Sequence, residues 1–183
     1  MLVRIIPVGS PPAKILEETA RALPGLVNVK TKLLPALGVP EETLNHWRKQ
    51  YDADRMVTLL SNEGIAKFIE KSLPVMFITD RDIYYDGLSF IFGMDDQKRA
   101  ASIISIARLR PEFYGQIANL SILQDRLIKE CVHKVGHHYG LDHCKHPFCV
   151  MNRSGSVGEV DKKQKYFCND CKLKASIKGI ELV

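Results

Sequence analysis

Residues 131–144 read CVHKVGHHYGLDHC, and this stretch decides what the rest of the chain must build. His133 and His137 are four residues apart, so on a helix they project from one face, one turn apart. Gly140 can adopt the left-handed conformation that ends a helix, which lets the chain turn and bring His143 back toward them. Three imidazoles with an open fourth position hold a catalytic zinc ion. We therefore predict zinc binding at these three histidines, and the alternative is a histidine-rich helix end without metal.

The chain has five cysteines, and four of them form two close pairs, Cys144 with Cys149 and Cys168 with Cys171. In a cytosolic protein such pairs are more often metal ligands than disulfides. Disulfide pairing is the alternative. The fifth, Cys131, points to a different helix face from the histidines, and we expect it to be a small buried side chain.

Length and composition bound the class of protein. The chain has 183 residues, 45% hydrophobic and 26% charged, which is ordinary for one globular domain with a full core. A net charge of +5 permits nucleic-acid binding but does not demand it. No apolar run approaches the ~20 residues of a membrane span. The apolar start, residues 1–7, is short and interrupted by Arg4, so it reads as a first strand and not a signal peptide. We predict a cytoplasmic protein.

Hydrophobic periodicity predicts a βαβ opening followed by a mixed set of strands and helices. The expected strands are 3–8, 26–34, 75–79, 88–92 and 100–108, and the expected helices are 13–23, 55–71 and 116–139. Residues 35–54 read as a long irregular stretch. The last helix carries the histidines, and its predicted inward side chains are Ile117, Leu120, Leu123, Leu127, Cys131 and Val135.

The histidines and Gly140 match the metzincin zinc-peptidase signature H-E-x-x-H-x-x-G-x-x-H. Cys144 follows the third histidine directly, and Cys149-Val150-Met151 and Cys168-x-x-Cys171 come after it. This combined pattern resembles the archaemetzincins, a metzincin branch whose motif adds four cysteines around a methionine. Residues 78–84, 87, 90–93 and 48–51 resemble further blocks of that family, so the resemblance covers most of the chain.

The resemblance implies an α/β fold of mixed α+β character: a metzincin-like mixed sheet with backing helices, a long active-site helix and a small C-terminal part. Residues 1–183 would form a single domain. Residues 1–141 would be the sheet-and-helix part that ends in the active-site helix, and residues 142–183 would carry the Met-turn and a four-cysteine zinc site.

The resemblance also assigns roles to residues outside the histidine motif. Met151 would be the Met-turn residue, an apolar floor below the histidines; the alternative is an ordinary core methionine. The four cysteines would hold a second, structural zinc ion, a closed tetrahedral site, and His146 could replace one thiolate. Leu88–Phe92 would be the edge strand that pairs with an extended peptide, or else a plain core strand.

Lys134 stands where the signature has its glutamate, the general base that takes a proton from the zinc-bound water. An ammonium near Zn²⁺ is repelled, since at an effective dielectric near 20 a unit charge at ~4 Å is worth about 4 kcal/mol. We expect Lys134 to lean away from the metal and to pair with Glu130, one turn earlier, at the rim of the site. Two alternatives are a deprotonated Lys134 acting as base and Glu130 reaching the water.

The sequence thus predicts an archaemetzincin-like zinc metallopeptidase with two zinc ions, whose peptide-bond hydrolysis is impaired by Lys134. Its partner would be a peptide or protein in an edge-strand cleft, with no nucleic acid and no membrane, and the protein would be a monomer. A second hypothesis is a non-catalytic peptide-binding protein that uses the same cleft. A third is a nucleic-acid-binding zinc module built on the cysteine pairs and the Lys-rich tail, for which no aromatic stacking platform is evident.

Overall fold

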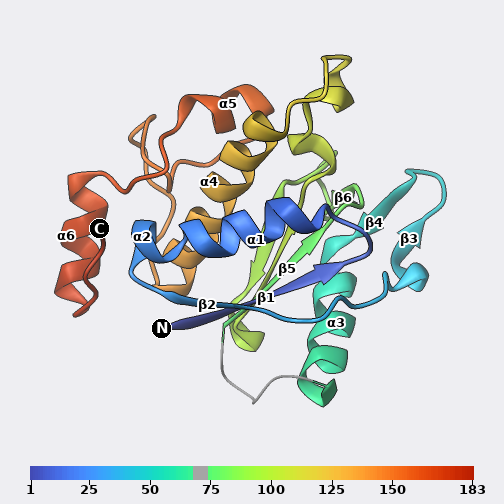
Figure 1. Ribbon diagram of the computed structural model, residues 1–183, viewed down its shortest axis with the longest axis horizontal. Helices are drawn as coiled ribbons and strands as arrows, with labels where there is room; N and C mark the ends of the chain where they lie inside the picture. Colours follow the sequence, from blue (N-terminus) through green and yellow to red (C-terminus); the bar gives the residue numbers. More distant parts are fainter. Residues whose placement is uncertain (68–73) are drawn as a thin grey trace.

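A five-stranded sheet in the order β2-β1-β5-β8-β7 forms the centre of the computed structural model, which describes residues 1–67 and 74–183 (Figure 1). The strands are β1 Leu2–Val8, β2 Lys30–Leu33, β5 Val75–Thr79, β7 Gly93–Asp96 and β8 Ala101–Ser105. Strands β2, β1, β5 and β8 run parallel, and β7 pairs antiparallel with β8 at the edge. The mixed sheet that the resemblance implied is therefore present.

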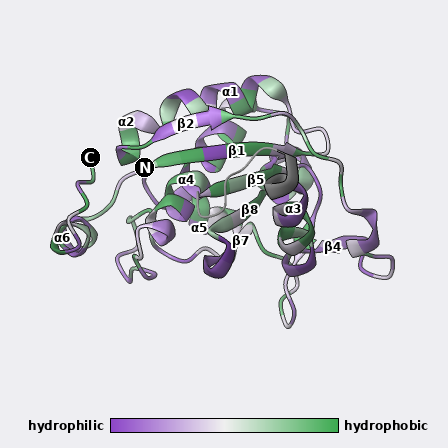
Figure 2. Cartoon of the chain, turned by 90° about the horizontal axis from the view of Figure 1, so that it is seen from below, coloured by the Kyte–Doolittle hydropathy of each residue, from purple (hydrophilic) through white to green (hydrophobic). Residues whose placement is uncertain are grey.

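The sheet separates two apolar clusters because consecutive side chains of a strand point to opposite faces. Val3 and Ile5 of β1 pack with helices α1 (Ala13–Ala22) and α4 (Leu120–His138). Ile6 and Val8 pack on the other face with helix α3 (Ala53–Lys67). Figure 2 shows the central strands largely hydrophobic and the edge strand β2 largely hydrophilic. Burial on both faces explains why the central strand β5 reads as one continuous apolar run.

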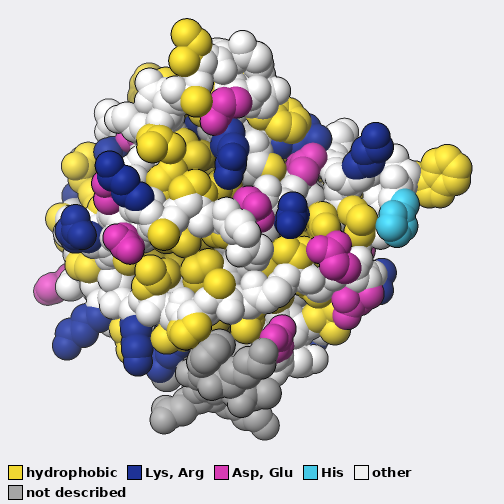
Figure 3. Space-filling view, turned by 45° about the vertical axis from the view of Figure 1, so that its right-hand side comes forward, with side chains coloured by type: hydrophobic (Ala, Val, Ile, Leu, Met, Phe, Trp, Pro, Cys, Tyr) yellow, Lys and Arg dark blue, Asp and Glu magenta, His cyan; other side chains and the backbone are white. Residues whose placement is uncertain are grey.

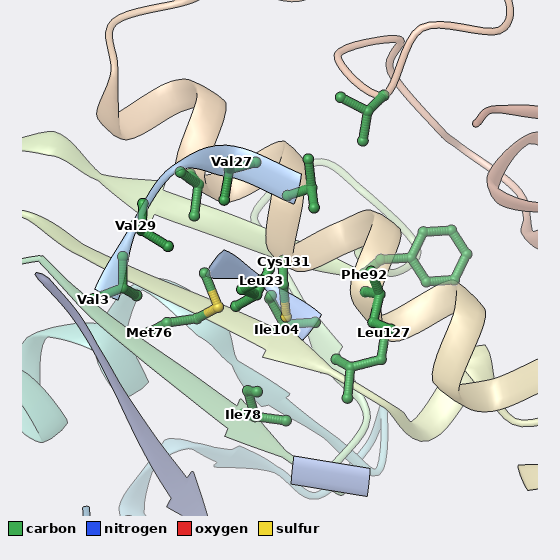
Figure 4. Packing of buried hydrophobic residues seen from close by; sticks show 14 of the residues in the cluster. Val3, Leu23, Val27, Val29, Met76, Ile78, Phe92, Ile104, Leu127 and Cys131 are labelled. Atoms are coloured by element: carbon green, nitrogen blue, oxygen red, sulfur yellow. The ribbon is translucent and has the colours of Figure 1, made fainter. Parts of the chain in front are cut away.

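The core below the long helix α4 joins sheet and helix side chains. Met76, Ile78 and Ile104 from the sheet lie near Leu127 and Cys131 of α4 (Figure 4). Cys131 is fully buried, as predicted from its position on the helix. This packing fixes the position of α4 on the sheet, and with it the position of the histidines at the end of that helix.

A second, three-stranded sheet lies within and beyond the stretch that we predicted to be irregular. Its order is β3-β4-β6, with β3 Leu44–Asn45, β4 Gln50–Asp52 and β6 Ile83–Tyr84. The prediction of an irregular 35–54 was therefore wrong.

The remaining elements are α2 Pro24–Val27, α5 Val157–Lys162, α6 Asn169–Ile177 and the 3₁₀ turns η1 Glu41–Thr43, η2 Gln97–Arg99, η3 Ala107–Leu109 and η4 Pro111–Tyr114.

Several predicted boundaries were wrong, the first of them because a side-chain cap sets the start of a helix. Helix α4 begins at Leu120, since the Asn119 side chain accepts a hydrogen bond from the backbone N–H of Ile122. Ile117 and Leu120, predicted to point inward, are instead 92% and 56% exposed. The strand predicted at 26–34 is shortened because α2 occupies its beginning, and the strand predicted at 100–108 spans only 101–105. The end of the helix predicted at 55–71 lies outside the described residues.

Among the residues that are described, no helix is both long and apolar enough to cross a membrane.

Candidate metal centres

The end of helix α4 turns back on itself at Gly140. Its φ angle is 72°, in the left-handed region, and the N–H of Leu141 donates to the carbonyl of Gly136 at 3.0 Å. These are the features of a glycine-ended helix. The turn brings the ring of His143 to 5.2 Å from His133 and 4.8 Å from His137, measured between centroids. One ligand nitrogen of each histidine lies within 4.8 Å of the others.

The hydrogen bonds of two histidines fix which ring nitrogen is free. Nδ1 of His133 lies 2.8 Å from the carbonyl oxygen of Val150, and Nδ1 of His137 lies 2.8 Å from that of Leu141. Both Nδ1 atoms must carry the proton, because a carbonyl can only accept. The two Nε2 atoms, 3.0 Å apart, then present lone pairs to each other. Two lone pairs that face each other repel unless a cation lies between them. A histidine that binds a metal through one ring nitrogen usually donates the other N–H to a carbonyl or carboxylate, which orients the ring.

The environment also keeps these rings neutral, which is the form that binds a metal. Burial lowers the pKa of His133 well below its usual value, and the nearby charges of Lys134 and Lys163 lower it further. Burial is also the main reason why the pKa of His137 and that of His143 are lowered. The arrangement fits a zinc ion with three nitrogen ligands and an open side.

Met151 packs directly below the histidine helix. A Cβ atom added at Gly136, between the two helical histidines, would lie only 2.3 Å from the sulfur of Met151. Met151 is fully buried, and its neighbour Val150 accepts the hydrogen bond of His133. Met151 thus packs against the helix turn that carries His133 and His137, and its role as a Met-turn residue stays a prediction.

The four paired cysteines meet at one point. The Sγ atoms of Cys144, Cys149, Cys168 and Cys171 all lie within 4.8 Å of one another. The Cys144–Cys168 and Cys149–Cys171 sulfur distances are both 3.7 Å, and all four thiols are free. Four sulfurs about 2.3 Å from a tetrahedral zinc ion would stand ~3.8 Å apart. The geometry therefore fits a four-cysteine zinc site and not disulfides, and His146 does not belong to the group.

Lys134 is placed differently from our prediction. Its Nζ lies 2.9 Å from Oδ2 of Asp95 on the edge strand β7, and its side chain is only 5% exposed. Glu130, the predicted partner, instead lies 2.8 Å from Nζ of Lys163, which directly follows α5. The prediction of a Glu130–Lys134 pair at the rim was therefore wrong: Lys134 is buried, and an acidic residue 39 positions away along the chain neutralises it.

The predicted edge strand 88–92 is not a strand. At the start of this segment, backbone carbonyls accept from side chains: Nη2 of Arg48 donates to the carbonyls of Leu88 and Ser89 at 2.8 and 2.9 Å, and Nε2 of Gln50 donates to that of Ser89 at 3.0 Å. At its end, the carbonyl of Phe92 accepts from the backbone N–H of Ser105 in β8 at 2.8 Å. The edge of the sheet is β7, the next four residues.

A cavity of about 490 Å³ opens above the three histidines. Its floor is α4, one wall is the segment 85–95, and the other wall holds residues 153–155 and Lys163. Sequence reasoning missed Asp95, Arg153 and Lys163 as cavity residues. Each comes from an element remote from the histidine motif, so no local spacing could have pointed to it.

Comparison with known proteins gives one consistent relationship. The sequence profile of Peptidase family M54 matches residues 13–176. The chain is 33% identical over 175 residues to an archaemetzincin of Pyrococcus furiosus, covering 93% of this chain and 90% of the relative. The crystal structure of a zinc-dependent peptidase from Methanocorpusculum labreanum superposes with a TM-score of 0.86 at 27% identity, covering 94% of this chain and 99% of that one. For an archaemetzincin from Archaeoglobus fulgidus, solved as a complex with malonate, the TM-score is 0.79 at 30% identity, with 95% and 99% covered.

Proposed function

The chain belongs to peptidase family M54, the archaemetzincins, and from that membership we propose that it is a zinc metallopeptidase whose hydrolytic step is impaired at Lys134. The observation that carries the proposal is the buried ion pair of Lys134 with Asp95 beside the three histidines. An ammonium in an ion pair holds its proton and accepts none. The residue that the family signature uses as a base is therefore a cation here.

In this proposal His133, His137 and His143 hold the catalytic zinc ion. When bound, zinc would polarise the scissile carbonyl and lower the pKa of a water molecule to about 7. The protein's own contribution is to orient the rings through the carbonyls of Val150 and Leu141. What is missing is a carboxylate at position 134 to take the proton from the attacking water, a contribution of roughly 10²–10⁴-fold in rate.

Peptide cleavage by the zinc-loaded protein tests this proposal. A mixed peptide library, assayed over pH 6 to 9, should be cleaved slowly or not at all. A rate on the order of 1–10³ s⁻¹, usual for an enzyme, would show that another group serves as base.

A second candidate is a non-catalytic peptide-binding protein, favoured by the apolar side chains of Leu88, Phe90 and Phe92, which line the same cavity as the histidines. We propose that β7, whose outer side is the edge of the sheet, would receive an extended peptide in either case. On the face that Figure 3 draws, basic and acidic side chains are interspersed among the described residues, so that face offers no one-sided basic patch for a nucleic acid.

We also propose that residues 1–183 act as one monomeric domain in the cytoplasm. Phe167, Cys171 and Ala175 of the C-terminal part share the apolar cluster of α1 and α4, which supports a single domain. Four free thiols held for a metal suit a reducing compartment.

The expected metal content follows from the two groups of ligands, three histidines and four cysteines. The two ligand sets share no residue, so the purified protein should bind up to two zinc ions. The cysteine-bound ion should survive mild chelation and the histidine-bound ion should be lost first, since only the histidine site has an open position for a chelator. Elemental analysis before and after chelation checks this. At most one ion after zinc loading would contradict it.

A further inference from the structure

Three cations line the cavity above the histidines: Lys134, Lys163 and Arg153. Two carboxylates, Asp95 and Glu130, line it as well. The two lysines are buried and each faces one carboxylate, whereas Arg153 is exposed. The cations outnumber the anions even before a zinc ion adds two positive charges, so the cavity is electropositive.

Lys163 is the most enclosed of these groups. Its side chain is 1% exposed, its Nζ lies 2.8 Å from Oε1 of Glu130, and that nitrogen donates no well-aligned hydrogen bond among the described residues. An ammonium has three N–H donors, and one carboxylate oxygen cannot occupy them all. A buried lysine with spare donors on a cavity wall is suited to bind an oxygen atom of a ligand.

Another part of the cavity lining is apolar. Leu88, Phe90, Ile91 and Phe92 line it, and the rings of Phe90 and Phe92 pack edge to face with centroids 5.3 Å apart. A ligand that fills this cavity therefore meets both cationic groups and an apolar surface.

We propose that the cavity binds the C-terminal end of a peptide, with its α-carboxylate at the lysine side and an apolar last side chain against the wall of residues 88–92. The inference rests on the proposed role as a peptide site and names its ligand. Exchanging a carboxylate for an ammonium at position 134 raises the local charge by two units. Such a change favours an anion over the neutral amide of an internal peptide bond, because charge-assisted hydrogen bonds are about twice as strong as neutral ones.

Calorimetry on the zinc-loaded protein tests the inference. The probes are N-acetyl-Ala-Ala-Leu with a free carboxylate and the same peptide as its C-terminal amide. We expect the acid to bind at least about tenfold more tightly. Equal binding of acid and amide would overturn the inference while leaving a peptide site in place. If neither peptide binds, the peptide site itself fails, and the inference fails with it.

Acetate provides a third arm, because a small carboxylate could reach the same cations. Acetate should bind at least about tenfold more weakly than the peptide acid, since it cannot use the apolar wall. Acetate as tight as the peptide would show a site for small anions and overturn the assignment to a peptide end.

Substituting Lys163 and Glu130 together tests Lys163 without leaving the Glu130 carboxylate buried and unpaired. Glu130→Gln with Lys163→Met removes both charges of the buried pair, and the matched control is Lys162→Met, an exposed neighbour whose amine lies over Phe148 outside the cavity. In the paired variant the preference for acid over amide should fall to within about threefold, whereas the control should keep it. Zinc content and circular dichroism show that each variant is loaded and folded. A tenfold preference that survives in the folded paired variant would overturn the role of Lys163.

Discussion

Changing Cys168→Ser should lower the free energy of unfolding on the order of several kcal/mol and reduce the zinc content by about one ion. Binding of structural zinc is folding free energy, about 10–16 kcal/mol for a whole site in small zinc domains, and the substitution removes one of four thiolates. Cys168 is the N-cap of α6 and Cys171 lies in its first turn, while Cys144 and Cys149 come from the loop after the histidines. A zinc ion bound by these four thiolates would tie the C-terminal helix to the end of the histidine motif.

Thermal unfolding together with elemental analysis measures this effect. Cys131→Ala is the matched control: Cys131 is equally a free cysteine but is buried in the core away from the group of four. The control should lose only packing energy and keep its zinc. Unchanged unfolding and zinc content in Cys168→Ser would show that the four cysteines do not form a zinc site.

Local patterns in the sequence predicted the parts of the site that are local. The spacing of His133, His137 and Gly140 predicts one helix that carries both histidines and ends at the glycine. In the structure both histidines lie on α4, and Gly140 follows its end with a left-handed φ angle. Strand 75–79 was predicted with its true bounds, because burial on both faces leaves an unbroken apolar run.

Two errors near the site share one physical origin, which is contacts between distant segments. Helix periodicity offered Glu130 as the partner of Lys134, because it counts only neighbours on the same helix. The actual partner, Asp95, comes from the edge strand. The apolar run 88–92 reads as a strand, yet its first two carbonyls accept hydrogen bonds from the side chains of Arg48 and Gln50, about 40 residues earlier in the chain. Neither contact leaves a signal in the spacing of one sequence.

The ion pair between Lys134 and Asp95 determines how a base can be restored. Lys134→Glu alone would place two carboxylates next to each other in a nearly buried position, and one of them would resist ionisation. Removing one partner of a buried pair also costs about 3–5 kcal/mol. We therefore expect the single variant to be less stable than wild type and to gain little hydrolysis.

Combining Lys134→Glu with Asp95→Asn removes the repulsion and supplies a carboxylate beside the metal site. General-base catalysis contributes roughly 10²–10⁴-fold, so cleavage of a peptide library by the zinc-loaded double variant should rise by at least about tenfold over wild type. The matched control is Lys134→Gln with Asp95→Asn, which has the same loss of the ion pair and nearly the same shape but no base. It should stay at the wild-type rate.

The comparison separates three explanations of the chain's activity. If the glutamate variant alone gains hydrolysis, the missing base is what limits the wild-type protein. A gain in both double variants would mean that the ion pair itself blocks the site, for example by repelling the metal. Should wild type already be a robust peptidase, with neither variant faster, the proposal of impaired hydrolysis is wrong. If none of the proteins cleaves a peptide although each carries zinc at the histidines, the loss of activity lies beyond Lys134, and the protein is a peptide-binding member of a peptidase family.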